Sequence, residues 1–224
     1  MKKIGIIAAM DSELRSLAEK TENCTVQTIA SMPYYTGTLC GVPVVLCNCG
    51  VGKVNAALHT QILLDRFSPD VLIQTGVAGS LSPEVGYFDF VVGRELVYHD
   101  MQPWILEQFE PLSAVYTADE SLVEIAARAA EGCHVGRIAT GDQFISDAAD
   151  RKDIAGRTHA LCTEMEGCAV AQTAVLNEVP FVILRAISDM ADGTAEESFP
   201  VFAQKAADRA VEILLRMLPE VAAL

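Results

Sequence analysis

Basic residues are scarce in this chain, which has 16 Lys and Arg against 30 Asp and Glu and a net charge of −14. Each contact with a phosphate would have to form against a repulsive background, so binding to nucleic acid or to an anionic membrane surface is disfavoured. The charge balance therefore favours chemistry on a small molecule.

Aromatic side chains are also few, at 6% of the residues, whereas apolar residues make up 51%. The core must then be built from Val, Ile, Leu and Ala, which is typical of parallel or mixed sheets covered by helices. The 224 residues fit one such unit. We therefore expect a single α/β domain over residues 1–224, with a central mixed β-sheet flanked by α-helices.

Long apolar runs and paired cysteine motifs are lacking. No stretch reaches the roughly 18 residues of a membrane span, and the short apolar run after Lys2 and Lys3 leads directly into acidic residues, unlike a signal peptide. The seven cysteines are scattered and form no Cys-x-x-Cys pair, so we interpret them as reduced. These features predict a cytoplasmic protein.

Motifs for metals, serine hydrolases and nucleotides are missing as well. The four histidines show no metal-ligand spacing, and no Gly-x-Ser-x-Gly elbow occurs. Around Gly50 and Gly52 the phosphate-loop and dinucleotide patterns fail, because Val54 and Asn55 stand where Ser or Thr and the third Gly belong. What remains is a glycine turn at a helix N-terminus, consistent with ligand contact or with tight packing.

Apolar periodicity and its breakers indicate strands and helices in alternation. We predict strands over residues 4–9, 34–39, 42–47, 71–74, 88–97, 135–140 and 181–186, and helices from residue 11 and over 52–67, 119–130, 166–177 and 201–217. The small-residue run 75–79 is interpreted as a loop where backbone approaches a ligand.

Residues 101–118 interrupt this order, since Pro103, Trp104 and Pro111 break any periodic pattern. The segment is long for a connection within one domain, and such segments are often lids or interface segments. A surface loop without a role is the alternative interpretation.

Acidic residues follow several of the apolar strands. Glu13 comes after the first strand, Glu164 and Glu166 flank Met165 at a helix start, and Asp189 follows the last strand. Carboxylates desolvated at strand ends have raised pKa values, and two of them would supply the acid and base for cleaving a glycosidic bond. On the residues alone, helix or turn capping explains each of them better.

Seven motifs occur together and in order along nearly the whole chain. They are Ile4-Gly5-Ile6-Ile7-Ala8-Ala9-Met10 with Glu13, Gly50-Val51-Gly52-Lys53-Val54, Thr75-Gly76-Val77-Ala78-Gly79, Tyr98-His99-Asp100, Gly141-Asp142-Gln143-Phe144, Glu164-Met165-Glu166 and Arg185-Ala186-Ile187-Ser188-Asp189. In this combination the sequence resembles the 5′-methylthioadenosine/S-adenosylhomocysteine nucleosidases of the purine nucleoside phosphorylase superfamily. The resemblance implies an N-glycosyl hydrolase acting on 5′-thio-adenine nucleosides, without metal or organic cofactor, and a homodimer whose partner completes the 5′ end of each pocket.

The resemblance also implies roles for the catalytic residues. Asp189 would protonate N7 of adenine, oriented by Ser188. Glu166 would accept hydrogen bonds from the ribose hydroxyls. Glu13 would hold and deprotonate the attacking water, with Arg185 fixing that carboxylate or the water.

The remaining family positions surround the substrate. Phe144 would stack on the base and the Ile145 backbone would pair with its polar edge. Met165 would support the ribose hydroxyl network, while Met10, Val51 and Phe199 would surround the thioether. Ala9, Val77, Ala78 and Gly79 complete the predicted substrate contacts.

Two departures leave alternatives open. Val77 stands where many members of the family have Ser, and the residues from Met101 onward differ from the usual sequence that faces the 5′ group. A nucleosidase for 5′-deoxyadenosine or aminodeoxyfutalosine, a phosphorylase, and a non-catalytic nucleoside sensor are the competing functions. Glu13 argues against the phosphorylase, because its charge would repel a phosphate dianion.

Overall fold

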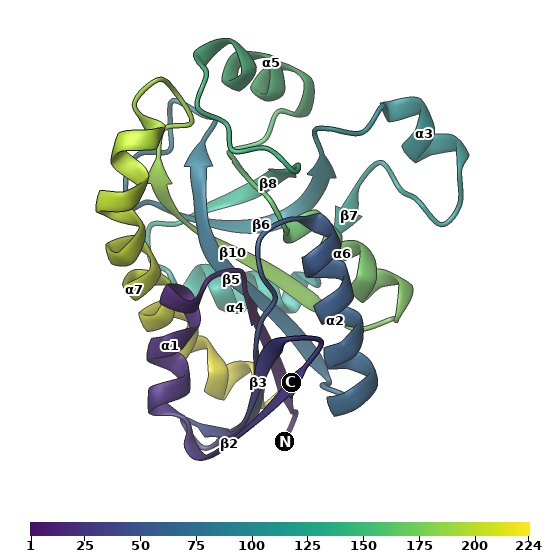
Figure 1. Ribbon diagram of the computed structural model, residues 1–224, viewed down its shortest axis with the longest axis vertical. Helices are drawn as coiled ribbons and strands as arrows, with labels where there is room; N and C mark the ends of the chain where they lie inside the picture. Colours follow the sequence, from purple (N-terminus) through teal and green to yellow (C-terminus); the bar gives the residue numbers. More distant parts are fainter.

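The computed structural model describes residues 1–11 and 14–224, and within them ten strands form one mixed sheet (Figure 1). The strands are β1 (Ile4–Ala8), β2 (Glu22–Ile29), β3 (Met32–Leu39), β4 (Val42–Asn48), β5 (Val71–Ser80), β6 (Phe90–Tyr98), β7 (Tyr116–Thr117), β8 (His134–Thr140), β9 (Cys162–Glu164) and β10 (Phe181–Asp189). The helices are α1 (Asp11–Lys20), α2 (Lys53–Phe67), α3 (Pro103–Gln108), α4 (Glu120–Ala129), α5 (Ala148–Thr158), α6 (Gly167–Leu176) and α7 (Ala195–Val221).

Part of the sheet closes on itself. β5 pairs with β10 along its length and with β9 at its end, while β6 joins β10 to β8 and β8 joins β9. These five strands therefore form a ring of hydrogen-bonded neighbours, and β1, β4, β3 and β2 continue from β5 as an open extension. A closed ring leaves no free sheet edge where its strands meet.

Helices cover both faces of the sheet. α1 and α4 each pack against α7, and α2 packs against α6 on the other side (Figure 1). The buried core consists mainly of Ile, Leu, Val and Ala. The predicted α/β class with a central mixed sheet is therefore confirmed, and its cause is the aliphatic composition that lets parallel strands be buried on both faces.

The small-residue run 75–79 was predicted as a loop, and this prediction is wrong. These residues continue β5 and pair in parallel with Leu184 to Asp189 of β10. A side chain would not fit at Gly79, where an added Cβ would lie 2.6 Å from the Asp189 Oδ1 atom. Small residues are needed here because of close packing against β10, within a regular strand.

Other boundaries also differ from the sequence prediction. Residues 101–118 contain α3, which begins with Pro103 at a position where a missing N–H costs nothing, and the two-residue strand β7. The last helix begins at Ala195 rather than after Pro200, because the buried Ala195 and Ser198 hold its first turn in place. The predictions omitted β2, β9 and α5, which are short or carry little apolar periodicity.

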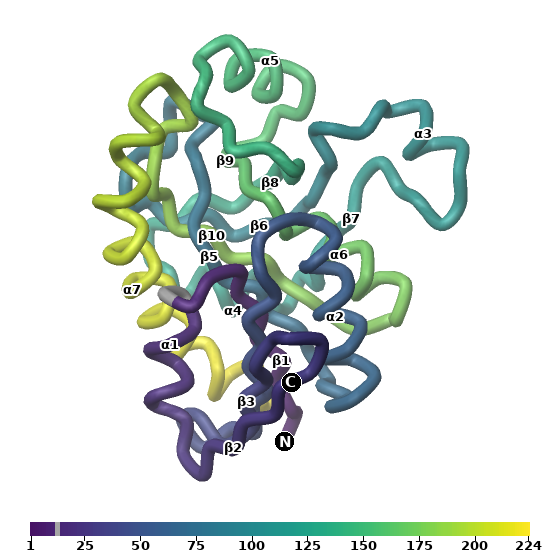
Figure 2. The backbone as a smooth tube through the Cα atoms, viewed as in Figure 1, coloured from purple at the N-terminus to yellow at the C-terminus, as the bar shows by residue number. Residues whose placement is uncertain are grey.

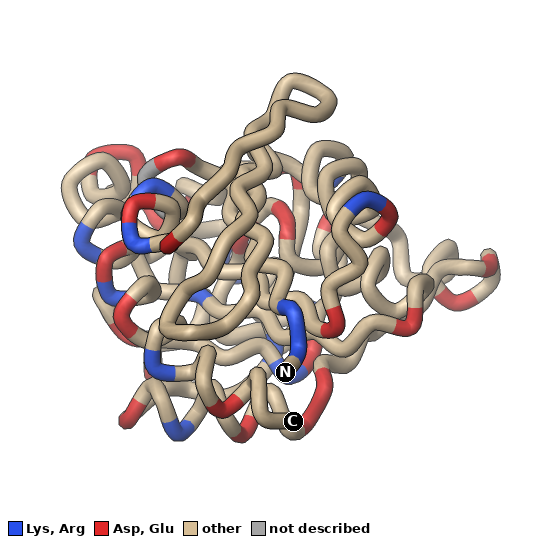
Figure 3. Tube along the Cα trace, turned by 90° about the horizontal axis from the view of Figure 1, so that it is seen from below, with Lys and Arg blue, Asp and Glu red and all other residues tan. Residues whose placement is uncertain are grey.

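The segment 101–118 projects from the body of the molecule, at the far end from α7 in Figure 2. The Asp and Glu residues are distributed over many segments of the chain rather than gathered in one (Figure 3). Across the two described ranges, no helix is both long enough and apolar enough to cross a membrane.

Candidate active site

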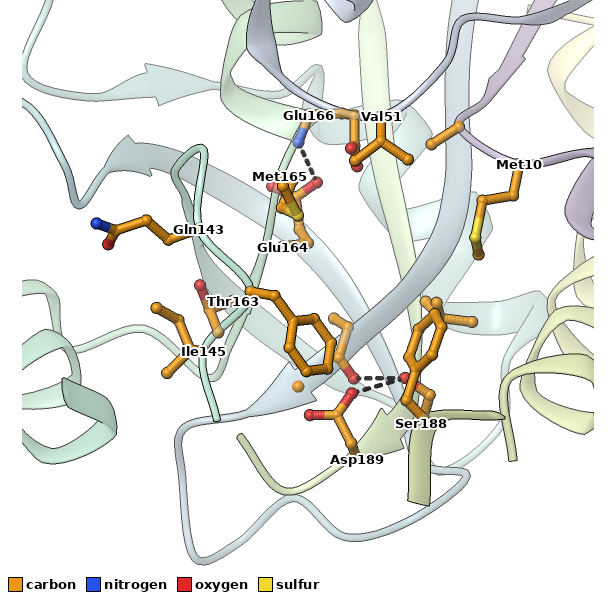
Figure 4. A pocket seen from close by; sticks show the side chains of 16 residues that line it. Met10, Val51, Gln143, Ile145, Thr163, Glu164, Met165, Glu166, Ser188 and Asp189 are labelled. Atoms are coloured by element: carbon orange, nitrogen blue, oxygen red, sulfur yellow. Dashed lines mark hydrogen bonds between the residues drawn. The ribbon is translucent and has the colours of Figure 1, made fainter. Parts of the chain in front are cut away.

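A cavity of about 250 Å³ opens where several strands end. Its walls come from the ends of β1, β5, β9 and β10, from the segments after β4 and β8, and from α7. The lining residues are Ala9, Met10, Val51, Val77, Ala78, Gly79, Gln143, Phe144, Ile145, Thr163, Glu164, Met165, Glu166, Ser188, Asp189 and Phe199 (Figure 4). Ligands of α/β proteins commonly bind at the carboxyl ends of the strands, where such residues converge.

The cavity brings together residues that are distant in sequence. All eleven residues predicted to contact substrate line it, as do Asp189 and Glu166. Arg185 does not line the cavity but pairs with Glu164 and Glu166 beside it. The side chain of Glu13 lies outside the described residues, so its predicted role stays a prediction.

Asp189 ends β10 and is 3% exposed. Its Oδ1 accepts a hydrogen bond from the Ala191 N–H at 2.9 Å, and the Ser188 hydroxyl donates to Oδ2 at 2.9 Å. Burial raises the pKa of this carboxyl, and the two hydrogen bonds only partly oppose that shift. Because its described donors are neutral, Asp189 keeps its proton to higher pH than an ordinary aspartate, as a proton donor requires.

Glu164 is buried like Asp189, but a neighbouring cation holds it in place. Its carboxylate pairs with the Arg185 guanidinium, accepts from the Thr140 hydroxyl, and accepts from the N–H groups of Glu166 and Gly167 at 3.0 and 2.7 Å. The last two donors belong to the start of α6, which is otherwise short of hydrogen-bond partners. Burial alone would raise the pKa of Glu164, but Arg185 and these donors hold it below the ordinary value.

Glu166 is held at the opposite end of the cavity from Asp189 (Figure 4). Its Oε1 accepts from the Gly52 N–H at 2.9 Å, and its Oε2 lies 4.0 Å from Arg185 Nη2. Gly52 has a φ of 95°, a conformation that only glycine adopts without strain, and it comes directly before α2. The carboxylate is thus fixed by the glycine turn and Arg185 while it still faces the cavity.

The rest of the lining is largely apolar. Phe144 meets Phe199 edge to face, with ring centroids 5.6 Å apart, and Phe144 is 45% exposed. Met10 and Val51 lie on other sides of the same space (Figure 4). Within the part of the chain that the structure describes, no three His, Cys, Asp or Glu side chains are arranged to hold a metal ion. The cavity therefore combines the aromatic rings of Phe144 and Phe199 with the fixed carboxyl groups of Asp189 and Glu166.

Sequence reasoning assigned no role to three of the lining residues, Gln143, Thr163 and Glu164. Glu164 stood inside a recognised motif, but its importance depends on Arg185, which is 21 residues away in sequence. Thr163 lies opposite Gly79 in the pairing of β9 with β5, a contact that no local pattern reveals. Gln143 follows Asp142 in the quoted motif, and its place beside Phe144 could have been inferred from that neighbour.

Comparison with known proteins shows the family of this chain. The family model described as the phosphorylase superfamily matches residues 3–219. A 5′-methylthioadenosine/S-adenosylhomocysteine nucleosidase of Anoxybacillus flavithermus is 42% identical over 97% of this chain and 98% of its own length.

Solved structures agree in fold over the whole chain. The S-adenosylhomocysteine nucleosidase of Streptococcus pyogenes, in complex with 5-methylthiotubericidin, superposes with a TM-score of 0.94 at 34% identity, covering 98% of this chain and 97% of that one. The futalosine hydrolase of Helicobacter pylori superposes with a TM-score of 0.93 at 28% identity, covering 98% of each chain. The chain therefore belongs to the 5′-methylthioadenosine/S-adenosylhomocysteine nucleosidases of the phosphorylase superfamily.

Proposed function

We propose that this protein hydrolyses the N-glycosidic bond of 5′-methylthioadenosine and S-adenosylhomocysteine, releasing adenine and the thioribose. The observation that carries the proposal is the pair of carboxyl groups at opposite ends of one apolar cavity. Asp189 has a raised pKa, and Glu166 is fixed by Gly52 and Arg185. One end can donate a proton to a leaving base, and the other can hold the sugar as it becomes positive.

Asp189 acts as the general acid. Its carboxyl delivers a proton, or a strong hydrogen bond, to N7 of adenine, so that the base leaves without negative charge. Ser188 orients the carboxyl through the hydrogen bond between its hydroxyl and Oδ2. An aspartate suits a 6-aminopurine, because its protonated form donates to N7 while neighbouring backbone accepts from the amino group.

Glu166 binds the ribose hydroxyls, and the hydrogen bonds tighten as positive charge develops on the sugar in the transition state. The backbone of Met165, which precedes Glu166, supports the same network. Glu164 and Arg185 support Met165 and Glu166 without contacting the sugar. Their buried ion pair limits movement of the β9–α6 junction that carries Glu166.

The nucleophile in this proposal is a water molecule held and deprotonated by Glu13, with Arg185 as the neighbouring cation. A carboxylate at the nucleophile position repels a phosphate dianion, which favours hydrolysis over phosphorolysis. The reaction as proposed uses protein side chains and water, with no cofactor.

The base and the 5′ group occupy the apolar part of the cavity. Phe144 stacks on adenine, the Ile145 backbone pairs with its polar edge, and Ala78 and Gly79 leave room for the ring. Around the sugar and the thioether, the proposed contacts are Ala9, Met10, Val51, Val77 and Phe199. Methionine and aromatic side chains suit a thioether because sulfur is polarisable.

We further propose a cytoplasmic homodimer built from a single nucleosidase domain over residues 1–224. Large apolar side chains are exposed on α2, on α6 and in the segment 101–118, and α2 packs against α6. They are Val54, Leu58, Trp104, Phe109, Val175 and Leu176. Exposed apolar patches of this kind mark protein interfaces. Burying them against a second copy would let the partner's projecting segment complete the 5′ end of the pocket.

The proposal is tested by adenine release from methylthioadenosine, S-adenosylhomocysteine, 5′-deoxyadenosine and inosine, each with and without phosphate and with products separated by chromatography. We expect phosphate-independent release from the two thio-nucleosides and none from inosine. Release only with phosphate would make the protein a phosphorylase, and tight binding without release would make it a sensor.

A second substrate class has a specific observation in its favour. The Helicobacter pylori futalosine hydrolase shares the fold over 98% of the chain, and the segment 101–118 departs from the family pattern where the 5′ group is expected. Comparing kcat/KM for methylthioadenosine, 5′-deoxyadenosine and aminodeoxyfutalosine would show which 5′ substituent this pocket prefers.

A further inference from the structure

Three charged residues outside the cavity connect two of its walls. Lys53 is the first residue of α2, Asp100 follows β6, and Asp142 follows β8. Lys53 Nζ lies 2.6 Å from Asp100 Oδ2 and 3.7 Å from Asp142 Oδ2. We refer to Lys53, Asp100 and Asp142 as the clasp.

Backbone groups belong to the clasp as well. The Lys53 N–H donates to Asp142 Oδ1 at 2.8 Å, and the Asp142 N–H donates to Asp100 Oδ2 at 2.9 Å. The first N–H groups of a helix have no partner within the helix, and a carboxylate is favoured there. Asp142 therefore caps α2 from a different segment of the chain.

Close packing makes this contact specific. A Cβ added at Gly52 would lie 3.1 Å from Asp142 Oδ1, so a larger residue at position 52 would crowd the carboxylate. Burial alone would raise the pKa of Asp100, but hydrogen bonds donated by the Lys53 ammonium and the Asp142 N–H hold it below the ordinary value, which keeps the anion in place.

The segments joined by the clasp form different parts of the cavity wall. On one side, Val51 lines the cavity and Gly52 holds Glu166. On the other side, Phe144 and Ile145 follow Asp142 by two and three residues and also line the cavity. The distance between the ribose wall and the base wall thus depends on contacts that the substrate does not touch.

We propose that Asp142 is a positioning residue for base recognition, which it controls by fixing Phe144 and Ile145 relative to the N-terminus of α2. This inference rests on the proposed function, because it assumes that Phe144 contacts the base. The clasp itself binds nothing and takes no part in proton transfer.

Asp142 fixes these residues relative to α2 mainly through its hydrogen bond to the Lys53 N–H, and its charge contributes less. Its side chain is 47% exposed, so water and salt screen the 3.7 Å ion pair with Lys53. An amide at position 142 would still accept the Lys53 N–H, whereas a methyl group would not. The pair Asp142→Asn and Asp142→Ala therefore separates the hydrogen bond from the charge.

The test combines these variants with Phe144→Ala in a double-mutant cycle on adenine release from methylthioadenosine, with Kd for the nucleoside measured by calorimetry. Asp142→Ala should raise KM and Kd about tenfold, as expected for loss of a hydrogen bond to a charged group, with little change in kcat. Asp142→Asn should restore most of the loss. In the Phe144→Ala background, Asp142→Ala should have little further effect, since residues acting through one another are non-additive.

The control is Glu120→Ala, which removes an exposed ion pair with Arg94 away from the cavity and should leave KM unchanged. Additive effects of Asp142→Ala and Phe144→Ala, or a fall in kcat alone, would overturn the positioning role while leaving the proposed function intact. A wild-type protein that binds methylthioadenosine without releasing adenine would overturn the proposed function alone. The positioning role of Asp142 would then be tested by the same double-mutant cycle with Kd as the measured quantity. A wild type that does not bind the nucleoside would overturn both.

Discussion

Two buried carboxyl groups that line one cavity differ in the direction of their pKa shifts. Asp189 at the end of β10 is surrounded by neutral donors, and burial raises its pKa. Glu164 at the end of β9 is buried as completely, yet the adjacent Arg185 lowers its pKa. Burial alone therefore does not decide the direction of the pKa shift, which depends on whether a guanidinium lies beside the buried carboxyl.

The largest expected effect is on the turnover number when Asp189, whose hydrogen-bond donors are neutral, is changed. Asp189→Asn cannot deliver a proton, so kcat for methylthioadenosine should fall by about 10² to 10⁴-fold, the usual contribution of a general acid. Binding should persist, because the amide keeps the shape of the side chain, and Kd measured by calorimetry should change little. Asp153→Asn, on the exposed face of α5, is the matched control, and near-normal kcat in Asp189→Asn would contradict the acid assignment.

The next largest effect is on the stability of the protein when Glu164, which is paired with Arg185, is changed. Glu164→Gln removes the negative charge that is paired with the buried Arg185 guanidinium, and the free energy of unfolding should fall by about 3 to 5 kcal/mol in urea denaturation. Glu120→Gln removes an exposed pair with Arg94 and should cost at most about 1 kcal/mol. Because the folded pKa of Glu164 is lowered, its contribution is present above the unfolded pKa and is lost as pH falls. Equal losses in the two variants would remove the distinction between the two carboxyl groups.

The smallest effect is a gain in stability at Asp189. Its folded pKa is raised, so its favourable contribution exists below the unfolded pKa and is lost as pH rises through the folded pKa. Asp189→Asn avoids burying a charge, so its Tm should exceed that of the wild type at neutral pH. The difference should shrink below about pH 4, where an unfolded aspartate is also protonated. A lower Tm for the variant at neutral pH would mean that the carboxylate is stabilised by contacts other than those described.

Local patterns were sufficient for most of the fold, and the family resemblance indicated most of the residues that line the cavity. The apolar strands indicated the sheet, and the ordered motifs pointed to Asp189, Glu166 and the apolar lining. Patterns failed where a residue's structure depends on distant neighbours. The run 75–79 has the composition of a loop, and only its pairing with β10 makes it a strand. Propensity alone cannot predict such a tertiary contact.

The same limit explains what was missed in the site. Glu164 ends a three-residue strand that is too short for periodicity, and its charge state depends on Arg185 in another strand. Glu166 was predicted to begin a helix, but it precedes α6, and this leaves its side chain directed to Gly52 and the cavity. In both cases the residue types were visible in the sequence, whereas their partners, Arg185 and Gly52, are brought close only by the tertiary fold.

The projecting segment 101–118 leaves the ring from β6 and returns through β7, and β7 pairs with β6 through Leu96 and Tyr116. The two ends of the segment are therefore tied together independently of what lies between them. Doubling the length of such a loop costs only about 0.6 kcal/mol in closure entropy. Insertions and deletions can therefore accumulate between these two ends over evolution at little cost to the stability of the ring of strands.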